Sequence, residues 1–122
     1  MAALQHVASV GLMVAGAVLL LIAAIGIVRL PDLFLRMSAT SKASSLGAGC
    51  MFLAVAVAAG NVSITARAMA GLMFLVLTTP VASHMIGRAA YLSGVPLWKG
   101  THCDDLKGRY DLADHTLKGR PD

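Results

Sequence analysis

The chain has 122 residues, of which 57% are hydrophobic and only 13% are charged. This balance is too apolar for an ordinary soluble domain of this length and indicates an integral membrane protein. The formal net charge of +4 could suit a nucleic-acid-binding protein, but the cations flank apolar segments without an aromatic-basic repeat. We therefore expect no nucleic-acid partner and interpret the charge as a membrane orientation signal.

Three windows free of Asp, Glu, Lys and Arg dominate the chain. They cover residues 7–28, 43–60 and 68–87, and each is within the roughly 17 to 25 residues that a helix needs to cross about 30 Å of hydrocarbon. No Lys or Arg precedes the first window and its apolar run is too long for a cleavable signal peptide, so we expect it to be retained. A buried helix of a soluble protein is the alternative for 43–60, the shortest window. We predict an all-α membrane protein with three transmembrane helices, in which 1–90 forms the transmembrane domain and 91–122 a cytoplasmic polar tail.

The distribution of Lys and Arg predicts the orientation. No cation precedes the first window, three follow it, Arg67 alone follows the second, and six lie beyond the third. Because positive residues are retained on the cytoplasmic side, we expect the N-terminus outside, the connection 29–42 in the cytoplasm, the turn 61–67 outside and the C-terminus in the cytoplasm. Arg67 opposes this rule, but one cation does not outweigh three.

The connection RLPDLFLRMSATSK carries the first group of candidate site residues. Pro31 suits the first position of a helix, and an apolar stripe and a charged side follow at helical spacing. The stripe comprises Leu30, Leu33, Phe34 and Met37, and the charged side comprises Arg29, Asp32 and Arg36. Asp32 and Arg36 are four residues apart, which allows an ion pair. We therefore predict a short interfacial helix between helices 1 and 2.

Two roles remain open for this charged segment, which ends at Lys42. It could be an anchor whose arginines meet lipid phosphates, or an edge that docks a neighbouring subunit or funnels ions. Hydroxyls that could cap the next helix follow at Ser38, Thr40 and Ser41. Small residues that would let another helix approach closely recur at Ala39, Ala43 and Gly47, and in the first window at Gly11 and Ala15.

The third window contains a helix breaker. Pro80 cannot donate to the carbonyl of Val76, so we expect a kink, and the hydroxyls of Thr78 and Thr79 could satisfy that carbonyl. The alternative is functional: the broken turn lines a hydrated path or a flexing interface. His84, four residues after Pro80, could titrate near neutrality or serve as a structural hydrogen-bonding residue.

No window contains an acidic residue, because the acids are Asp32 and five tail aspartates. Transporters usually place ionisable groups at mid-membrane, so this chain alone lacks a proton or metal-ion relay. We find no phosphate loop or catalytic constellation and expect neither an enzyme nor a cofactor. The tail has His102, Cys103, Asp104, Asp105 and His115 without zinc-site spacing, so no metal is expected. Cys50 and Cys103 lie too far apart in this topology for a disulfide and are predicted to be free thiols.

Three runs carry a resemblance to a known family: GIVRLPDLFLRMSATSKASSLG, LTTPVAS and GRAAYLSGVPLWKGTHCDDLKGRY. Together, in this order and spacing, they resemble the small G subunit of Mrp-type multisubunit cation/proton antiporters, the MrpG/MnhG/PhaG family. The resemblance covers residues 26–110. It implies a plasma-membrane hetero-oligomer of several Mrp subunits that exchanges Na+, or sometimes K+, for H+. Large partner subunits carry the proton path, and the G subunit is required for assembly and exchange without a complete ion path of its own.

The resemblance also assigns motif residues. Arg29, Pro31, Asp32, Arg36, Lys42 and Gly47 become candidates for a subunit interface or a cation entrance, and Thr78, Thr79, Pro80 and His84 for a helix kink or ion path. Gly94, Pro96, Trp98, Asp104 and Asp105 fit the family pattern in the tail. Ser38 departs from it, since many relatives have His there, so a proton-handling role at that position is replaced by hydrogen bonding or capping.

Two alternatives come from other classes. A holin-like self-assembling pore protein can also be small with three spans, although its tail is usually a simple lysine-rich end. A structural membrane scaffold would have the same packing features as an accessory subunit. Neither alternative accounts for the three runs in family order.

Overall fold

The computed structural model describes residues 2–111 and 113–118. It consists of three long helices, α1 (Ala2–Arg29), α2 (Leu33–Ala59) and α3 (Val62–Leu92), followed by the short strands β1 (Tyr110–Asp111) and β2 (Thr116–Leu117). Each helix is long and apolar enough to cross a membrane. This confirms the predicted all-α membrane fold with three transmembrane helices. The end of the predicted tail, 119–122, lies outside the described residues, and the division at residue 90 stays a prediction.

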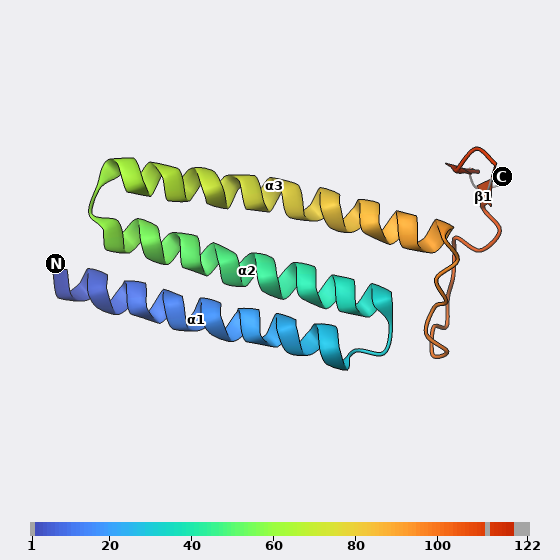
Figure 1. The fold of residues 1–122 in the computed structure, drawn as a ribbon, viewed down its shortest axis with the longest axis horizontal. Helices are drawn as coiled ribbons and strands as arrows, with labels where there is room; N and C mark the ends of the chain where they lie inside the picture. The colour runs from blue at the N-terminus through green and yellow to red at the C-terminus, as the bar shows by residue number, and fades with distance from the viewer. Residues whose placement is uncertain (1, 112, 119–122) are drawn as a thin grey trace.

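The three helices lie side by side in one layer, with α2 between α1 and α3 (Figure 1). The start of α1 and the turn from α2 to α3 lie at one end. The turn from α1 to α2 and the C-terminal segment lie at the opposite end, which we call the tail end. An odd number of spans requires the two termini to face opposite sides of a membrane, but which side is cytoplasmic stays a prediction.

The turn between α1 and α2 is only three residues long, Leu30 to Asp32. Asp32 has extended backbone angles, and its carboxylate accepts a hydrogen bond from the Phe34 N–H at 3.3 Å, so it is the N-cap of α2. The separate interfacial helix was therefore a wrong prediction: residues 33–42 form the first turns of α2. No Gly or Pro interrupts the chain between Leu33 and Gly47, so nothing ends the helix before it enters the apolar window.

The predicted hydroxyl caps of α2 are corrected by the same observation. Because Asp32 already caps the helix, Ser38, Thr40 and Ser41 all lie inside it. The Thr40 hydroxyl is buried with no hydrogen-bond partner. At the other end of α2, Gly60 takes the left-handed φ of 56° that ends the helix, and the Asn61 side chain accepts from the Ser63 N–H at 2.9 Å to begin α3.

Small residues bring α1 and α2 into close contact. The buried residues of α1 are Ser9, Gly16 and Ala23, which recur every seventh position and so form one seam along the helix. A Cβ atom on Gly16 would lie 2.8 Å from the Gly47 carbonyl oxygen, and one on Gly47 would lie 2.9 Å from that of Gly16. The two backbones therefore touch, as small residues permit in membrane helices.

The α2–α3 contact uses larger side chains set against glycines. The Phe52 ring covers Gly71, and the Met37 side chain covers Gly87, in each case so closely that a Cβ on the glycine would approach within 3 Å. Near the turn, the Thr65 hydroxyl donates to the Ala56 carbonyl at 3.1 Å. Each glycine thus leaves room for one side chain of α2. The two contacts together fix the register of α3 against α2.

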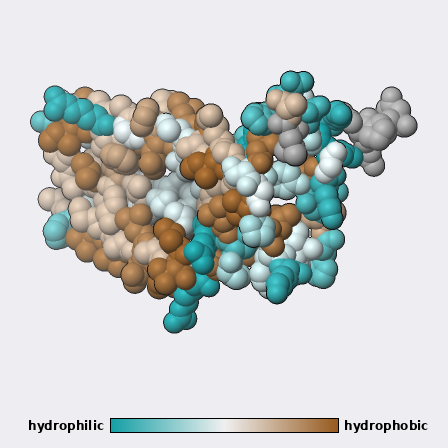
Figure 2. Space-filling model, turned by 45° about the vertical axis from the view of Figure 1, so that its right-hand side comes forward, coloured by the Kyte–Doolittle hydropathy of each residue, from teal (hydrophilic) through white to brown (hydrophobic). Residues whose placement is uncertain are grey.

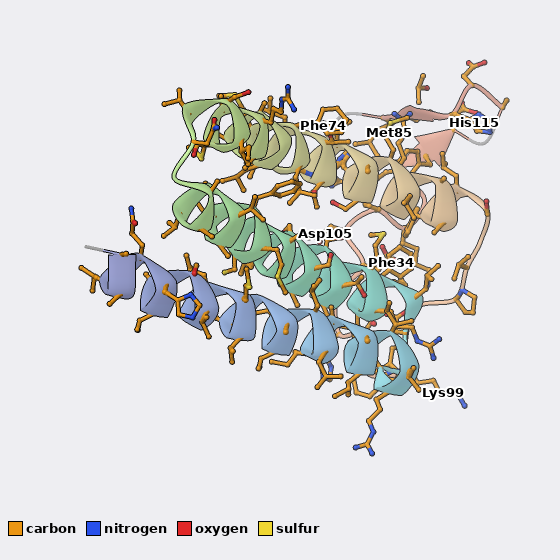
Figure 3. All side chains as sticks on the ribbon, turned by 60° about the vertical axis from the view of Figure 1, so that its left-hand side comes forward. Phe34, Phe74, Met85, Lys99, Asp105 and His115 are labelled. Atoms are coloured by element: carbon orange, nitrogen blue, oxygen red, sulfur yellow. The ribbon has the colours of Figure 1, made fainter. Side chains whose placement is uncertain are left out.

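Most apolar side chains point outward. Met73, Phe74 and Leu77 of α3 are all more than two-thirds exposed, and Phe74 points away from α2 (Figure 3). Figure 2 shows brown and tan surface over the helices and teal gathered mainly at the tail end. Contact between such an apolar surface and water is unfavourable, so the surface requires lipid or an apolar protein surface around it.

Candidate functional site

The two groups of residues singled out from the sequence meet in a groove between α2 and α3. This α2–α3 groove has a volume of about 670 Å³ and lies in the tail-end half of the helices. Its polar lining is Ser38, Ser41, Lys42 and Ser45 from α2 and Thr79, Ser83 and His84 from α3, with Pro80 among them. The sequence did not predict this meeting, because the antiparallel register that places Lys42 opposite Pro80 is set by side-chain packing.

Lys42 is the cation of the groove. Its side chain is exposed, and in the described part of the chain the one ion pair joins Lys118 to Asp111 at 3.7 Å, far along in the tail. None of the residues that line the groove is acidic. Lys42 therefore lines a largely apolar hollow in which no acidic residue neutralises its charge.

The threonines beside Pro80 do not act as expected. The Thr78 hydroxyl donates to the Phe74 carbonyl at 2.6 Å, and the Thr79 hydroxyl donates to the Leu75 carbonyl at 2.7 Å. Each bonds the carbonyl four residues before itself, so neither reaches the Val76 carbonyl that Pro80 leaves without a donor. α3 runs as one helix through Pro80, and the view in Figure 1 shows no abrupt bend there. The expected kink stays a prediction.

The charged residues of the α1–α2 turn mostly stabilise the turn itself. The Arg36 Nε donates to the Leu30 carbonyl at 2.6 Å, and the Leu30 N–H donates to the Gly26 carbonyl at 3.1 Å. Asp32 is 7% exposed and occupied with its capping bond, so the predicted Asp32–Arg36 ion pair does not form. Pro31 precedes the cap instead of starting the helix. Arg29 remains exposed at the end of α1.

Gly47, a candidate for an interface with another subunit, is instead buried between two helices of this chain. It is buried against Gly16 and Leu20 of α1. Ala39 likewise lies near Gly26, whose Cβ would come within 3.5 Å of it. Gly11 of the other predicted small pair has open space around it. The small-residue spacing in α2 therefore indicated close helix packing correctly, and the partner is α1.

The tail folds back against the end of α3. The Tyr91 hydroxyl donates to both carboxylate oxygens of Asp104, at 2.9 and 3.1 Å, and the rings of Tyr91 and Tyr110 lie 5.7 Å apart. The Arg88 guanidinium donates to the His115 carbonyl at 2.6 Å. Figure 3 shows His115 beside the end of α3. The sequence alone did not predict this docking, because aromatic residues at 91 and 110 carry no spacing signal.

A second hollow, the tail pocket, lies under this folded segment. It has a volume of about 500 Å³, and its walls include Phe34 of α2, Tyr91 of α3 and Asp104 and Asp105 of the tail. His84 lines both the tail pocket and the α2–α3 groove. His84 therefore lies where the two hollows adjoin.

Cys103 offers a test of the tail geometry. Its thiol donates to the Asp105 carboxylate at 3.3 Å, and this bond together with the carboxylate charge raises the pKa of the thiol. Below the raised pKa the thiolate fraction falls tenfold per pH unit, so Cys103 should react slowly with iodoacetamide near pH 8. In a Cys50→Ser background, we expect Asp105→Asn to lower the pKa and speed alkylation at that pH severalfold. Identical pH profiles with and without Asp105 would contradict the contact.

Both cysteines are free, as predicted. Over residues 2–111 and 113–118, no group of three or more His, Cys, Asp or Glu side chains is arranged to hold a metal ion. The chemistry available to the site is therefore that of hydroxyls, one lysine and one histidine along an apolar groove.

The fold and the site define a small multi-pass membrane protein. The family model PhaG_MnhG_YufB, described as Na+/H+ antiporter subunit, matches residues 12–91. The chain is 36% identical over 113 residues to the G subunit of a Na(+)/H(+) antiporter of Alkalihalophilus pseudofirmus, covering 91% of this chain and 94% of that protein. It is 37% identical over 106 residues to the G1 subunit of a Na(+)/H(+) antiporter of Staphylococcus aureus, covering 84% and 86%. The chain belongs to the PhaG/MnhG/YufB family of Na+/H+ antiporter subunits.

Solved structures share the fold. A chain of the Mrp complex from Dietzia sp. superposes with a TM-score of 0.81 at 24% identity, over 86% of this chain and 95% of that one. A chain of an archaeal respiratory membrane complex, the membrane-bound sulfane sulfur reductase, superposes with a TM-score of 0.76 at 33% identity, over 81% and 92%. The protein is thus a multi-pass protein of the cell membrane, and its relatives are subunits of larger membrane complexes. Family membership favours this class over a holin-like pore or a lone scaffold.

Proposed function

We propose that this chain is an accessory subunit of a multisubunit Na+(K+)/H+ antiporter, a secondary transporter and not an enzyme. Its partners are the other Mrp antiporter subunits and the lipid bilayer, and Na+ and H+ are the ions that the complex exchanges. The chain is required for assembly and exchange by the complex. Family membership supports the role, and the absence of acidic residues from all three apolar windows carries the restriction to an accessory one.

The single-layer fold supports this proposal. Because only α2 lies between two helices, α1 and α3 each leave a broad apolar face uncovered within the described residues. Three helices in a row cannot enclose an ion path, which needs polar groups shielded from lipid on every side. A path in this complex would therefore be completed by other subunits.

The tail end is the proposed cytoplasmic side. Of the nine Lys and Arg residues that the structure describes, eight lie in the tail-end halves of the helices or in the tail, and Arg67 alone lies toward the opposite end. Arg29 is exposed at this end, whereas Asp32 and Arg36 are engaged in hydrogen bonds within the turn. We therefore assign the docking edge to Arg29 rather than to the other two charged residues.

Co-purification tests the function. The full chain, tagged and extracted from its native membrane in mild detergent, should bring down large antiporter-like subunits in fixed proportion, and vesicles lacking the chain should lose Na+-dependent proton release. Arg29→Glu should weaken the co-purification severalfold, whereas Arg67→Glu, an equivalent reversal at the opposite end, should not. Recovery of the chain only as a homo-oligomer would refute the accessory-subunit role. Equal behaviour of the two variants would refute the docking edge alone.

A further inference from the structure

We propose that the α2–α3 groove holds a phospholipid with an anionic headgroup. In this arrangement the phosphate lies beside Lys42 and His84, and an acyl chain runs along Leu46 and Val76. This inference goes beyond the accessory role, because it assigns a ligand to the groove and does not depend on contacts with other subunits.

The groove has the polarity of a lipid. Leu46, Val76 and Pro80 give it apolar walls, while the polar residues Ser38, Lys42 and His84 line its tail-end part. No acidic side chain lines the groove itself, and Asp104 and Asp105 line the adjoining tail pocket, which shares His84 with it. An anionic group that enters beside Lys42 therefore meets attraction without a carboxylate in the groove. A hydroxyl, an ammonium and an imidazole are together suited to phosphate oxygens.

Lys42 lies at the level of the helices where a lipid headgroup is expected. Lys42 immediately precedes the charge-free window 43–60, and on α3 the next cation after the window 68–87 is Arg88, one turn beyond His84. Both helices therefore pass from charged to apolar sequence at the level where the groove has its polar end. Lysine near a membrane surface attracts anionic lipid at that depth.

The groove has room for part of a lipid chain. From Ser38 to Leu46 its α2 wall is about 12 Å long at 1.5 Å per residue, and its volume is about 670 Å³. A membrane supplies acyl chains of suitable width at its open side.

The test counts lipids on the full chain, together with whatever subunits co-purify. The protein is placed in bilayer discs of phosphatidylglycerol and phosphatidylcholine in equal amounts, released into mild detergent, and analysed by native mass spectrometry. We expect wild type to retain phosphatidylglycerol preferentially. Lys42→Gln should lower this retention about fivefold, whereas Lys42→Arg should preserve it. Arg67→Gln, which removes a cation at the opposite end, is the matched control and should leave retention unchanged.

A second variant tests the groove without altering its charge. Leu46 is 62% exposed, so Leu46→Trp should be tolerated by the fold while its ring fills the groove and displaces the lipid. Unchanged phosphatidylglycerol retention in both Lys42→Gln and Leu46→Trp would overturn the proposal. Equal retention of the two lipids by wild type would also overturn it. So would efficient cross-linking of Ser45→Cys to another subunit, because a protein would then occupy the groove. The number of lipids per chain can be measured even if no antiporter subunit co-purifies. Failure of the lipid proposal can therefore be distinguished from failure of the proposed function.

Discussion

Replacing Gly47 by leucine should force α1 and α2 apart and strongly destabilise the protein. A Cβ at this position would already lie 2.9 Å from the Gly16 carbonyl oxygen and 3.1 Å from the Leu20 nitrogen. These are backbone atoms, which cannot move aside as a flexible side chain can. Overpacking of a close contact costs about 1–3 kcal/mol, and we expect Gly47→Leu to reach the upper end of that range because the two helices must separate.

The measurement is thermal unfolding of the full chain in detergent, together with its abundance in the membrane. Gly16→Leu, on the other side of the same contact, should give a similar loss. Gly11→Leu adds the same side chain to α1 at a position with nothing within 4 Å and should behave as wild type. If Gly47→Leu unfolded at the same temperature as Gly11→Leu, the close approach of the two helices would be refuted.

The second large effect is expected for Pro80→Ala, on exchange and not on assembly. Alanine restores an N–H that can donate to the Val76 carbonyl, which Pro80 leaves without a helical partner. One regained hydrogen bond is worth about 1 kcal/mol. If α3 must bend at Thr79 and Pro80 during exchange, the additional hydrogen bond opposes that bending. A barrier raised by about 1 kcal/mol should slow exchange about fivefold.

Assembly and transport must be measured separately for this variant. We expect co-purification of the partner subunits to be unchanged and Na+-dependent proton release from vesicles to fall. Val81→Ala is the control, because it alters an exposed neighbouring side chain and leaves every backbone donor as it was. Full exchange activity in Pro80→Ala would refute the flexing interface suggested at Pro80 by the sequence and leave the proline with a purely structural role.

The helix ends show where local sequence was sufficient and where it was not. The charge-free windows located all three spans, because a long apolar run has no stable state in water. They underestimated the helix lengths: α2 begins at Leu33 instead of near Ala43. Charged residues do not end a helix, so the boundary of the membrane and the boundary of the helix need not coincide. The cap at Asp32 is a local signal that was available and was assigned instead to an ion pair.

The sequence predicted some residues of the candidate site but not how they meet. The residues Lys42, Thr79, Pro80 and His84 were singled out from two separate segments, and all four line one groove. Gly47 was singled out as well, but the structure places it against α1. A small residue indicates that something approaches closely, and it carries no information on which helix that is.

The sequence by itself determined the class of this protein, its three spans and its family, because these depend on composition, run length and motif order. Only the tertiary structure decided which faces meet. Gly16 contacts Gly47, Phe52 covers Gly71, and Tyr91 binds Asp104 of the tail. These contacts depend on the rotation and register of each helix, which are fixed by the fit of side chains from distant segments and are not encoded in any one stretch of the chain.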